Sequence, residues 1–518
     1  MTFKLTYANM FDPPAEMHER YEAALAELET SLGNKHSLFI DGADYPSAEY
    51  GAKYSPIDTS LLLGEFALAS GDDVDAAMRA AHAAAAGWRR TPATERIALM
   101  RKVAEMLDQR VYLLAAVLTL ETGKNRFEAL GEAQETADFF RVYADSFEEQ
   151  GFDHRMPNDP LSDWVSTNRS VMKPHGVWVV ITPFNFPVAL AGGPAAAAMV
   201  TGNTVVLKGA SDTPWVGRML ADCLHEAGVP KGVFNYLSGP GSRIGNALTD
   251  HRLTAGVTFT GSYEIGMGIA RKMATGRYVK PCIAEMGGKN ACIVTANADL
   301  ERAALGIFRS AFGMGGQKCS ALSRLYVHED VADQLIERLK QHLSSVSIGD
   351  PRLNEHWLGP VTTTQARDNY VRYAAELKDG ATVIHGGELL DDAGPGFYVE
   401  PMQAEAPLTH ALWQEEMFLP ILMMARVKSL DEALELANES ALGLTGGIYG
   451  SDEEVEIFLD RIEAGVLYVN RPQGATTGAW PGYQSFGGWK GSGTTGKAIG
   501  SFYYLAQYMR EQSHTIVE

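Results

Sequence analysis

From Val177 onward, short apolar runs rich in β-branched residues alternate with segments long enough to form helices. Strands that are apolar throughout need cover on both faces of their sheet, which is typical of parallel βαβ units. Strands are expected at residues 177–181, 204–207, 233–237 and 254–259, and helices between them include 213–227 and 263–274. The chain is therefore predicted to contain an α/β domain with a parallel sheet.

A second series of the same kind starts at Ile283 and ends near Asn470. Its strands are expected at 291–294, 325–327 and 421–427, and its helices at 300–312, 331–345 and 430–438. A chain of 518 residues has room for about three domains, so this half is predicted to be another α/β domain. Residues 164–172 and 502–517 fit neither series and are expected to be extended edges that pair with another subunit.

The N-terminal part, residues 12–150, reads mainly as helices apart from an extended stretch at 38–63. An amphipathic helix is expected at 15–32. Thr91 and Pro92 are expected to supply a cap and a first-turn proline to a helix ending near Arg110. This region is predicted to be scaffold.

Residues 176–207 contain no charged residue and no histidine, a run longer than the roughly 20 residues of a membrane helix. Pro183, Pro187 and a predicted turn at Gly192-Gly193-Pro194 interrupt the run, and such breaks leave backbone groups unsatisfied in lipid. We therefore expect a buried strand, a loop, a small-residue helix and a second buried strand.

The chain has 44 Lys and Arg against 64 Asp and Glu, a net charge of −20. Long-range repulsion argues against nucleic acid or an anionic membrane as the main partner, but an anionic small substrate can still bind a local pocket. Four cysteines cannot form a disulfide framework, and residues 1–21 contain no apolar signal core. A cytoplasmic protein without a metal site is predicted.

Cys319 stands in the run Gly-Gly-Gln-Lys-Cys-Ser, between an expected helix and an expected strand. Lys318 and the first amides of a short helical turn are expected to lower the pKa of its thiol. The alternative is a small buried hydrophobe, which is what Cys223, Cys282 and Cys292 are expected to be.

Two further residues follow expected strands. Glu285 precedes two glycines and is a candidate general base, with an exposed turn acid as the alternative. Asn185 is a candidate oxyanion donor or a turn-forming asparagine.

The loop at 259–262, Phe-Thr-Gly-Ser, has the form of a phosphate site at a helix N-terminus. The motif G-x-G-x-x-G is absent at the first βα turn, where Pro183 and Phe184 stand, so a conventional Rossmann dehydrogenase is disfavoured.

These motifs occur in a characteristic order along the chain: Asn185, Lys208, the loop at 259–262, Glu285 in EMGGKN, Cys319 in GGQKCS and Glu416 in EEMFLP. The series resembles that of the aldehyde dehydrogenase superfamily, from about Leu38 to the C-terminus. The resemblance implies an aldehyde dehydrogenase-like α/β fold: two α/β domains with parallel sheets, one a Rossmann-like cofactor domain and one catalytic, plus a β oligomerisation arm. The implied bounds are 1–150 with 171–284 for the N-terminal helical region and NAD(P)-binding domain, 285–485 for the catalytic domain, and 151–170 with 486–518 for the arm. A homo-oligomer, either a dimer or a multiple of dimers, is expected.

The resemblance also implies the catalytic roles. Cys319 would attack the aldehyde to give a thiohemiacetal, whose oxyanion is held by the Asn185 amide and the Cys319 backbone N–H. Glu285 would then activate water to hydrolyse the thioester that follows hydride transfer. Lys208 and Glu416 would position the two riboses and Ser262 the pyrophosphate. The cofactor-binding residues implied are Thr182, Pro183, Phe184, Lys208, Ser211, Gly241, Thr260, Gly261, Ser262, Glu416 and Phe418.

Within the superfamily the chain is similar to the 1-pyrroline-5-carboxylate dehydrogenase family, which oxidises L-glutamate γ-semialdehyde to L-glutamate in proline catabolism. The similarity is carried by Ser320, by the loop Thr477-Gly478-Ala479 and by residues 484–488. It implies that Ser320 and the loop hold the substrate carboxylate while aromatic rings flank its aliphatic part. The substrate-binding residues implied are Glu135, Phe186, Ser320, Gly478, Ala479 and Phe486. The alternatives are a dehydrogenase for another semialdehyde or aldehyde, a CoA-acylating variant, and a non-catalytic relative.

Four positions depart from the family pattern. Trp480 and Trp489 are expected to reshape the substrate pocket, and Leu419 replaces a glycine near Glu416. Ser211 stands where many members have a glutamate that binds the adenosine ribose. Because serine does not repel a 2′-phosphate, NADP is allowed, with help from Arg243, although NAD is the first choice.

Overall fold

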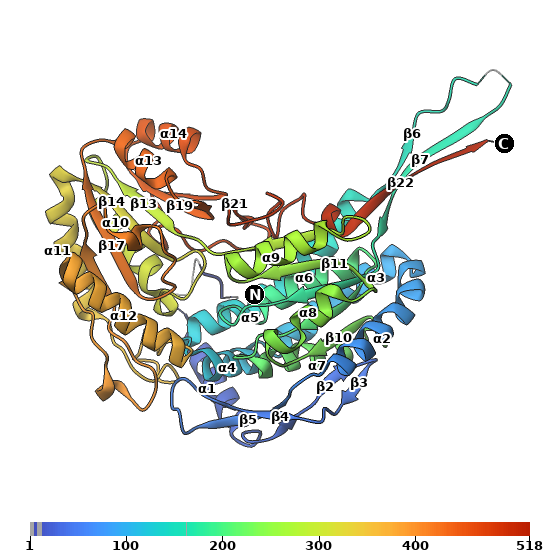
Figure 1. Ribbon diagram of the computed structural model, residues 1–518, viewed down its shortest axis with the longest axis horizontal. Helices are drawn as coiled ribbons and strands as arrows, with labels where there is room; N and C mark the ends of the chain where they lie inside the picture. Colours follow the sequence, from blue (N-terminus) through green and yellow to red (C-terminus); the bar gives the residue numbers. More distant parts are fainter. Residues whose placement is uncertain (1–4, 8–12, 162, 518) are drawn as a thin grey trace.

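The computed structural model describes residues 5–7, 13–161 and 163–517, and these build two large sheets and a projecting arm (Figure 1). The first sheet contains, in spatial order, β12 (Cys282–Glu285), β11 (Thr254–Thr260), β8 (Val177–Ile181), β9 (Thr204–Lys208), β10 (Phe234–Leu237), β2 (Leu38–Ile40) and β3 (Ala43–Tyr45). The strands from β12 to β10 are parallel, and β2 and β3 extend the sheet in antiparallel fashion.

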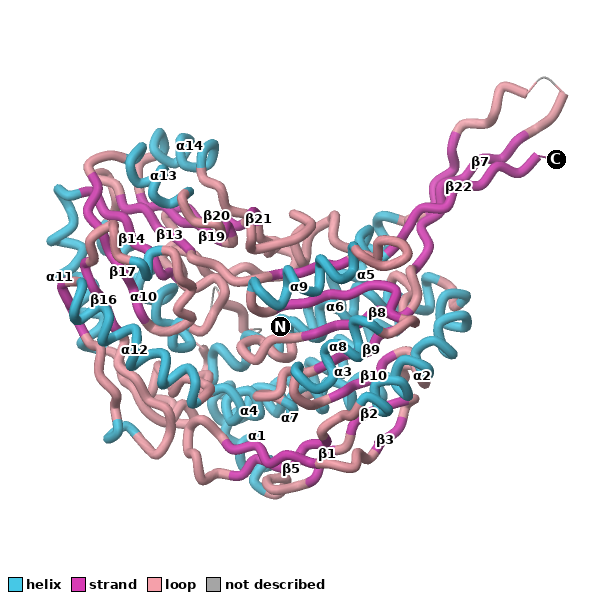
Figure 2. Tube along the Cα trace, viewed as in Figure 1, coloured by secondary structure: helices cyan, strands magenta, loops and turns pink. Residues whose placement is uncertain are grey.

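Helices cover both faces of this sheet (Figure 2). Side chains alternate along β8: Trp178 and Val180 enter one core, and Val177 and Val179 enter the other. The first core also contains residues of α3 (Ala93–Gln109), α5 (Arg126–Gln150), α6 (Ala189–Val200) and α7 (Pro214–Ala227). The second contains residues of α2 (Gly71–Arg90), α8 (Gly241–Asp250) and α9 (Tyr263–Ala274). Burial on both faces explains why this run is apolar without interruption.

The second sheet is built in the same way. Its order is β15 (Thr382–His385), β16 (Met402–Glu405), β17 (Ile421–Val427), β14 (Leu322–His328), β13 (Asn290–Val294), β19 (Thr445–Tyr449) and β20 (Val466–Val469), all parallel except β15. One core lies against α10 (Leu300–Phe312) and α11 (Glu329–Ser345), and the other against α12 (Thr364–Gly380), α13 (Leu430–Asn438) and α14 (Asp452–Arg461). The two α/β units predicted from the alternation are therefore confirmed.

The remaining elements lie around these units. They are α1 (Ala15–Glu29), α4 (Val111–Thr122), the small sheet of β1 (Lys35–His36), β5 (Leu62–Ala67) and β4 (Tyr50–Tyr54), and the pair β18 (Leu442–Gly443) with β21 (Trp489–Lys490). No helix in the described part of the chain is long and apolar enough to cross a membrane.

The arm is an antiparallel sheet of β6 (Asp153–Met156), β7 (Ser166–Pro174) and β22 (Met509–Val517), which projects from the body (Figure 1). Of the two segments expected to be extended edges, residues 166–172 and 509–517 pair with each other, with Ser166 opposite Val517, whereas Leu505–Tyr508 forms a 3-10 helix. Pairing with another subunit stays a prediction. Because β7 lies between β6 and β22, only the two outer strands leave an edge open.

Two local predictions are wrong. Gly192, Gly193 and Pro194 form no turn but lie inside α6, where the absence of a side chain lets this helix approach α5 closely. A Cβ atom at Gly192 would lie 2.5 Å from Cγ2 of Thr136. The second concerns α3, which begins at Ala93, so that Pro92 takes the cap position; Thr91 instead donates its hydroxyl to the Gly87 carbonyl.

Candidate active site

The first sheet contains a point where the strand order reverses. From β8 the chain proceeds to β9 and β10 on one side, and it then returns to place β11 on the other side of β8. Ligands of open α/β sheets bind beyond the carboxyl ends of the strands at such a point. Lys208 ends β9 opposite Ile181 of β8, and Glu285 ends β12 opposite Thr260 of β11. The residues proposed from sequence as cofactor and base groups thus follow neighbouring strands at one edge.

The loop that carries Cys319 connects α10 to β14 and lies against this edge. The Asn290 side-chain amide donates to the carbonyls of Cys319 (2.7 Å) and Ala321 (2.9 Å), which holds the loop on the start of β13. Asn185, which is buried, donates from Nδ2 to the Gln317 carbonyl at 3.0 Å. An amide nitrogen has two hydrogens, so Asn185 has a second N–H beside the cysteine loop.

The environment of the Cys319 thiol differs in part from the prediction: backbone hydrogen bonds from Ser320 and Cys319 lower its pKa as expected, but burial outweighs them. Burial raises its pKa to about 12, and the charges of Glu416 and Glu285 add to the rise. Lys318 does not lower this pKa, because its ammonium group binds the Glu128 carboxylate at 2.7 Å. The thiol is therefore protonated at neutral pH in this state and must lose its proton as it attacks.

Glu285 is a buried carboxylate rather than an exposed turn acid, with 8% of its surface accessible. Its Oε2 accepts a hydrogen bond from the Gly488 backbone N–H at 3.2 Å, and burial raises its pKa to about 8. A carboxylate with this pKa is a stronger base near neutral pH than an ordinary glutamate.

Two residues expected to hold a cofactor, Glu416 and Phe418, contact loops that follow strands of the first sheet. Glu416 accepts from the Gly288 N–H at 2.9 Å, and Phe418 adopts a left-handed conformation with φ of 57°. The left-handed conformation in this loop is thus adopted by Phe418. Leu419, which replaces the glycine of the family pattern, does not adopt it. Phe184 packs edge-on against Phe418, with 5.9 Å between ring centroids.

Other groups fit a dinucleotide. The Thr182 hydroxyl is buried and has no hydrogen-bond partner among the described residues. α9 begins after Ser262, whose side chain makes no capping hydrogen bond within the described structure, so the first amides of this helix can meet a phosphate. Burial lowers the pKa of Lys208 to about 8.

Ser211 follows β9, and Gly241 and Arg243 follow β10. Ser211 is exposed and donates to the Gly239 carbonyl at 3.2 Å, and Gly241 opens α8. Arg243, expected to assist a 2′-phosphate, pairs with Glu49 at 2.5 Å. An incoming phosphate would have to compete with that carboxylate.

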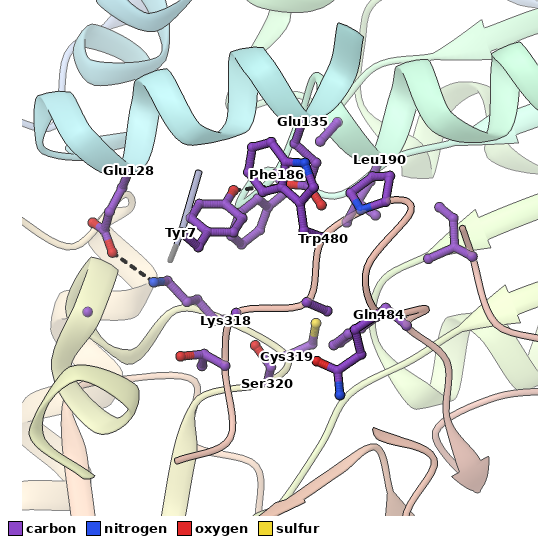
Figure 3. A pocket seen from close by; sticks show the side chains of 18 of the residues that line it. Tyr7, Glu128, Glu135, Phe186, Leu190, Lys318, Cys319, Ser320, Trp480 and Gln484 are labelled. Atoms are coloured by element: carbon purple, nitrogen blue, oxygen red, sulfur yellow. Dashed lines mark hydrogen bonds and ion pairs between the residues drawn. The ribbon is translucent and has the colours of Figure 1, made fainter. Parts of the chain in front are cut away.

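A cavity of about 110 Å³ lies beside Cys319, which forms part of its lining (Figure 3). The six residues expected to bind substrate all line it: Glu135, Phe186, Ser320, Gly478, Ala479 and Phe486. Trp480 lines it as well, whereas Trp489 does not and is 52% exposed. The expected reshaping of the pocket is therefore confined to Trp480.

Helix α5 presents a stripe of carboxylates to the site, and each of them holds a different part of it. Glu128 binds Lys318, Glu132 accepts from the backbone N–H groups of Val188 and Ala189, and Glu135 accepts from the Tyr7 hydroxyl. Asp138 accepts from the Trp480 indole. Sequence reasoning missed Tyr7, Glu128, Glu132 and Asp138. The spacing of 128, 132, 135 and 138, which places all four on one helix face, was the signal for the acidic residues.

Glu132 also pairs with Lys124, and neither side chain is exposed. We expect Glu132→Gln to lower the free energy of unfolding by about 3–5 kcal/mol, because it leaves a buried ammonium group unpaired. Urea denaturation of the variant and the wild type measures the difference in the free energy of unfolding. Glu149→Gln, at an exposed position of the same helix, is the control and should change the value by less than about 0.5 kcal/mol. Equal effects of the two variants would contradict the structural role of the buried pair.

Cys319, the Asn185 amide and the buried Glu285 carboxylate thus lie near the carboxyl edge of a parallel sheet, an arrangement that suits an enzyme. The aldehyde dehydrogenase family model matches residues 45–514, and the chain belongs to this family. It is 36% identical over 504 residues to 1-pyrroline-5-carboxylate dehydrogenase 1 of Halalkalibacterium halodurans, covering 96% of each chain. It is 38% identical over 506 residues to 1-pyrroline-5-carboxylate dehydrogenase 2 of Bacillus subtilis, again covering 96% of each. A solved structure of 1-pyrroline-5-carboxylate dehydrogenase from Thermus with bound NAD matches with a TM-score of 0.93 at 33% identity, over 100% of this chain and 99% of that one.

Proposed function

We propose that this enzyme oxidises L-glutamate γ-semialdehyde to L-glutamate with NAD as the preferred cofactor. The observation that carries the proposal is the cavity, in which Cys319 is joined by carboxylate-binding and ammonium-binding groups. The names of the curated relatives support the same substrate.

The cavity suits each part of this substrate. The Ser320 hydroxyl and the backbone amides of Gly478 and Ala479 are neutral donors for the α-carboxylate. Glu135, on the opposite wall, offers a carboxylate to the α-ammonium group, and burial has raised its pKa to about 8. Binding of a cation there would favour its ionised form. Phe186 and Phe486 enclose the aliphatic carbons.

In the proposed mechanism, the Cys319 sulfur attacks the aldehyde carbon and its proton leaves to solvent through the cavity. The Asn185 amide and the Cys319 N–H stabilise the oxyanion of the thiohemiacetal. A nicotinamide cofactor held by Thr182, Lys208, Ser262 and Glu416 would supply the hydride acceptor needed to form the thioester. Glu285 then takes a proton from water, whose oxygen attacks the thioester carbon. Cleavage of the C–S bond releases the carboxylic acid and the Cys319 thiolate, and Glu285 returns its proton to the sulfur.

The arrangement of residues supports the assignment of domains. Residues 1–150 with 171–284 would hold most of the cofactor, chiefly through Thr182, Lys208 and Ser262, while Glu416 and Phe418 would reach it from residues 285–485. Pro183, Phe184, Thr260 and Gly261 would shape the site. Residues 285–485 would form the catalytic domain. The open edges of the arm suit pairing with a second subunit, so we propose a homo-oligomer that acts in the cytoplasm.

The test is an absorbance assay of NADH formation with a panel of aldehydes. We expect kcat/KM for glutamate semialdehyde to exceed that for butanal by about 100-fold or more, because butanal leaves the polar groups of the cavity unpaired. Ser320→Ala should lower the ratio of kcat/KM for glutamate semialdehyde to kcat/KM for butanal. A higher kcat/KM for butanal would contradict carboxylate anchoring by Ser320, Gly478 and Ala479, and no turnover of any aldehyde with either cofactor would contradict the enzymatic proposal.

Cofactor preference is tested at Ser211. A glutamate there would repel a 2′-phosphate, so we expect Ser211→Glu to lower kcat/KM with NADP by about tenfold or more and to change the NAD value by less than about threefold. Ser211→Gln adds bulk without charge and is the matched control. An equal loss with both cofactors would place Ser211 away from the adenosine ribose.

A second candidate is a dehydrogenase for another carboxylate-bearing semialdehyde. Trp480, a bulky residue in the cavity wall at a position where the family pattern has an aliphatic one, favours it. Succinate semialdehyde in the same panel distinguishes the two.

A further inference from the structure

One wall of the substrate cavity is made of aromatic rings from three distant parts of the chain. Trp480 packs edge-on against Tyr7, with 5.2 Å between ring centroids, and Tyr7 packs edge-on against Phe186 at 6.5 Å (Figure 3). Trp480 belongs to the loop that follows Gly478 and Ala479, and Phe186 to the loop of Asn185. The Tyr7 ring therefore contacts both the loop that follows Gly478 and Ala479 and the loop that contains Asn185.

Tyr7 lies before α1, far in sequence from every other group at the site, yet it occupies a place built for it. Its hydroxyl donates to Oε2 of Glu135 at 3.0 Å. Its ring lies over Gly131, which is one turn before Glu135 on α5. A Cβ atom added to Gly131 would lie 2.6 Å from Cε1 of Tyr7. Any larger residue at position 131 would displace the ring.

Trp480 is held just as firmly. It is 4% exposed, and its indole N–H donates to Oδ2 of Asp138 at 2.9 Å. Asp138 also accepts from Arg141 at 2.8 Å, which fixes the carboxylate. The ring thus has a defined position in the wall and does not merely fill space.

We propose that Tyr7 and Trp480 form the closed end of the aldehyde pocket and limit the size of the substrate, so that a residue before α1 takes part in specificity. This inference rests on the proposed aldehyde oxidation and adds to it: the pocket accepts short, linear aldehydes and excludes longer ones by contact with these two rings. Tyr7 has a second effect, because its hydroxyl orients Glu135 toward the ammonium group of an amino-acid semialdehyde.

The experiment measures kcat/KM of the full-length enzyme for linear aldehydes from propanal to octanal and for glutamate semialdehyde. The wild type should lose activity with increasing length. Tyr7→Ala, Gly131→Ala and Trp480→Leu should each raise the ratio of octanal to propanal by about tenfold, as expected when one or two methylene-sized contacts are relieved. Tyr7→Phe keeps the ring, so it should retain the wild-type length profile and lose activity only with glutamate semialdehyde.

Tyr483→Ala is the control, because this ring lies three residues from Trp480 but is 83% exposed and lies outside the cavity wall. Thermal melting verifies that each variant is folded, and the three opening variants test the same wall independently. An unchanged length profile in folded Tyr7→Ala and Trp480→Leu would overturn the inference. Failure of the proposed substrate is a separate result: the wild type would then oxidise linear aldehydes but not glutamate semialdehyde.

Discussion

Replacing Cys319 with serine is expected to lower kcat for aldehyde oxidation by about 10³-fold or more. A serine hydroxyl at this position is a far weaker nucleophile than a thiolate, and no other group in the proposed mechanism can form the thioester. NADH formation measured by absorbance gives the rate. The loss should appear with every aldehyde, because it concerns the reacting atom and not the binding of a side group.

Cys282→Ser is the matched control for this variant. Cys282 begins β12, three residues before Glu285, and it is a free thiol that is partly accessible. Its replacement should leave kcat within about threefold of the wild type. If Cys282→Ser were as inactive as Cys319→Ser, or if Cys319→Ser kept most of its activity, the assignment of the nucleophile would be wrong.

Replacing Glu285 with glutamine is expected to lower steady-state turnover by about 10²–10⁴-fold, the usual contribution of a general base. Rapid mixing should still show a burst of about one NADH per active site, because thioester formation precedes the step that needs the base. The pH dependence gives a second readout. The base acts in its deprotonated form, so wild-type kcat should rise as the pH increases through about 8, the raised pKa of Glu285.

Glu456→Gln, at an exposed position of α14, is the control and should keep both the turnover and the pH profile. Loss of the burst in Glu285→Gln would show that Glu285 also takes the proton of Cys319, whose pKa is raised to about 12. A pH profile that is unchanged in the variant would assign the titration near 8 to another group.

Much of the fold follows from local patterns. The uninterrupted apolar run at Val177–Ile181 predicts a strand buried on both faces, and α9, α10, α13 and β17 have the bounds expected from sequence. Gly192 shows the limit of such patterns. A Gly-Gly-Pro run favours a turn when only its neighbours are considered, but close packing against Thr136 of α5 makes the same residues suitable for a helix.

Some residues of the site can also be recognised from local sequence, and others cannot. Cys319, Glu285 and Asn185 stand in motifs that are compact in sequence, so their types and positions can be recognised before the structure is known. Tyr7 cannot, because its partner Glu135 is 128 residues away and the contact depends on tertiary packing. The expected effect of Lys318 on the pKa of the Cys319 thiol was also wrong, since its partner Glu128 is 190 residues away in the sequence.

The most direct test of the account is to identify the covalent intermediate. Glu285→Gln enzyme is mixed with NAD and glutamate semialdehyde, quenched with acid after the burst, digested, and analysed by mass spectrometry. We predict one glutamyl group per chain as a thioester on the peptide that contains Cys319, dependent on NAD. An adduct on Cys223, Cys282 or Cys292, or NADH formation without any acylated peptide, would contradict it.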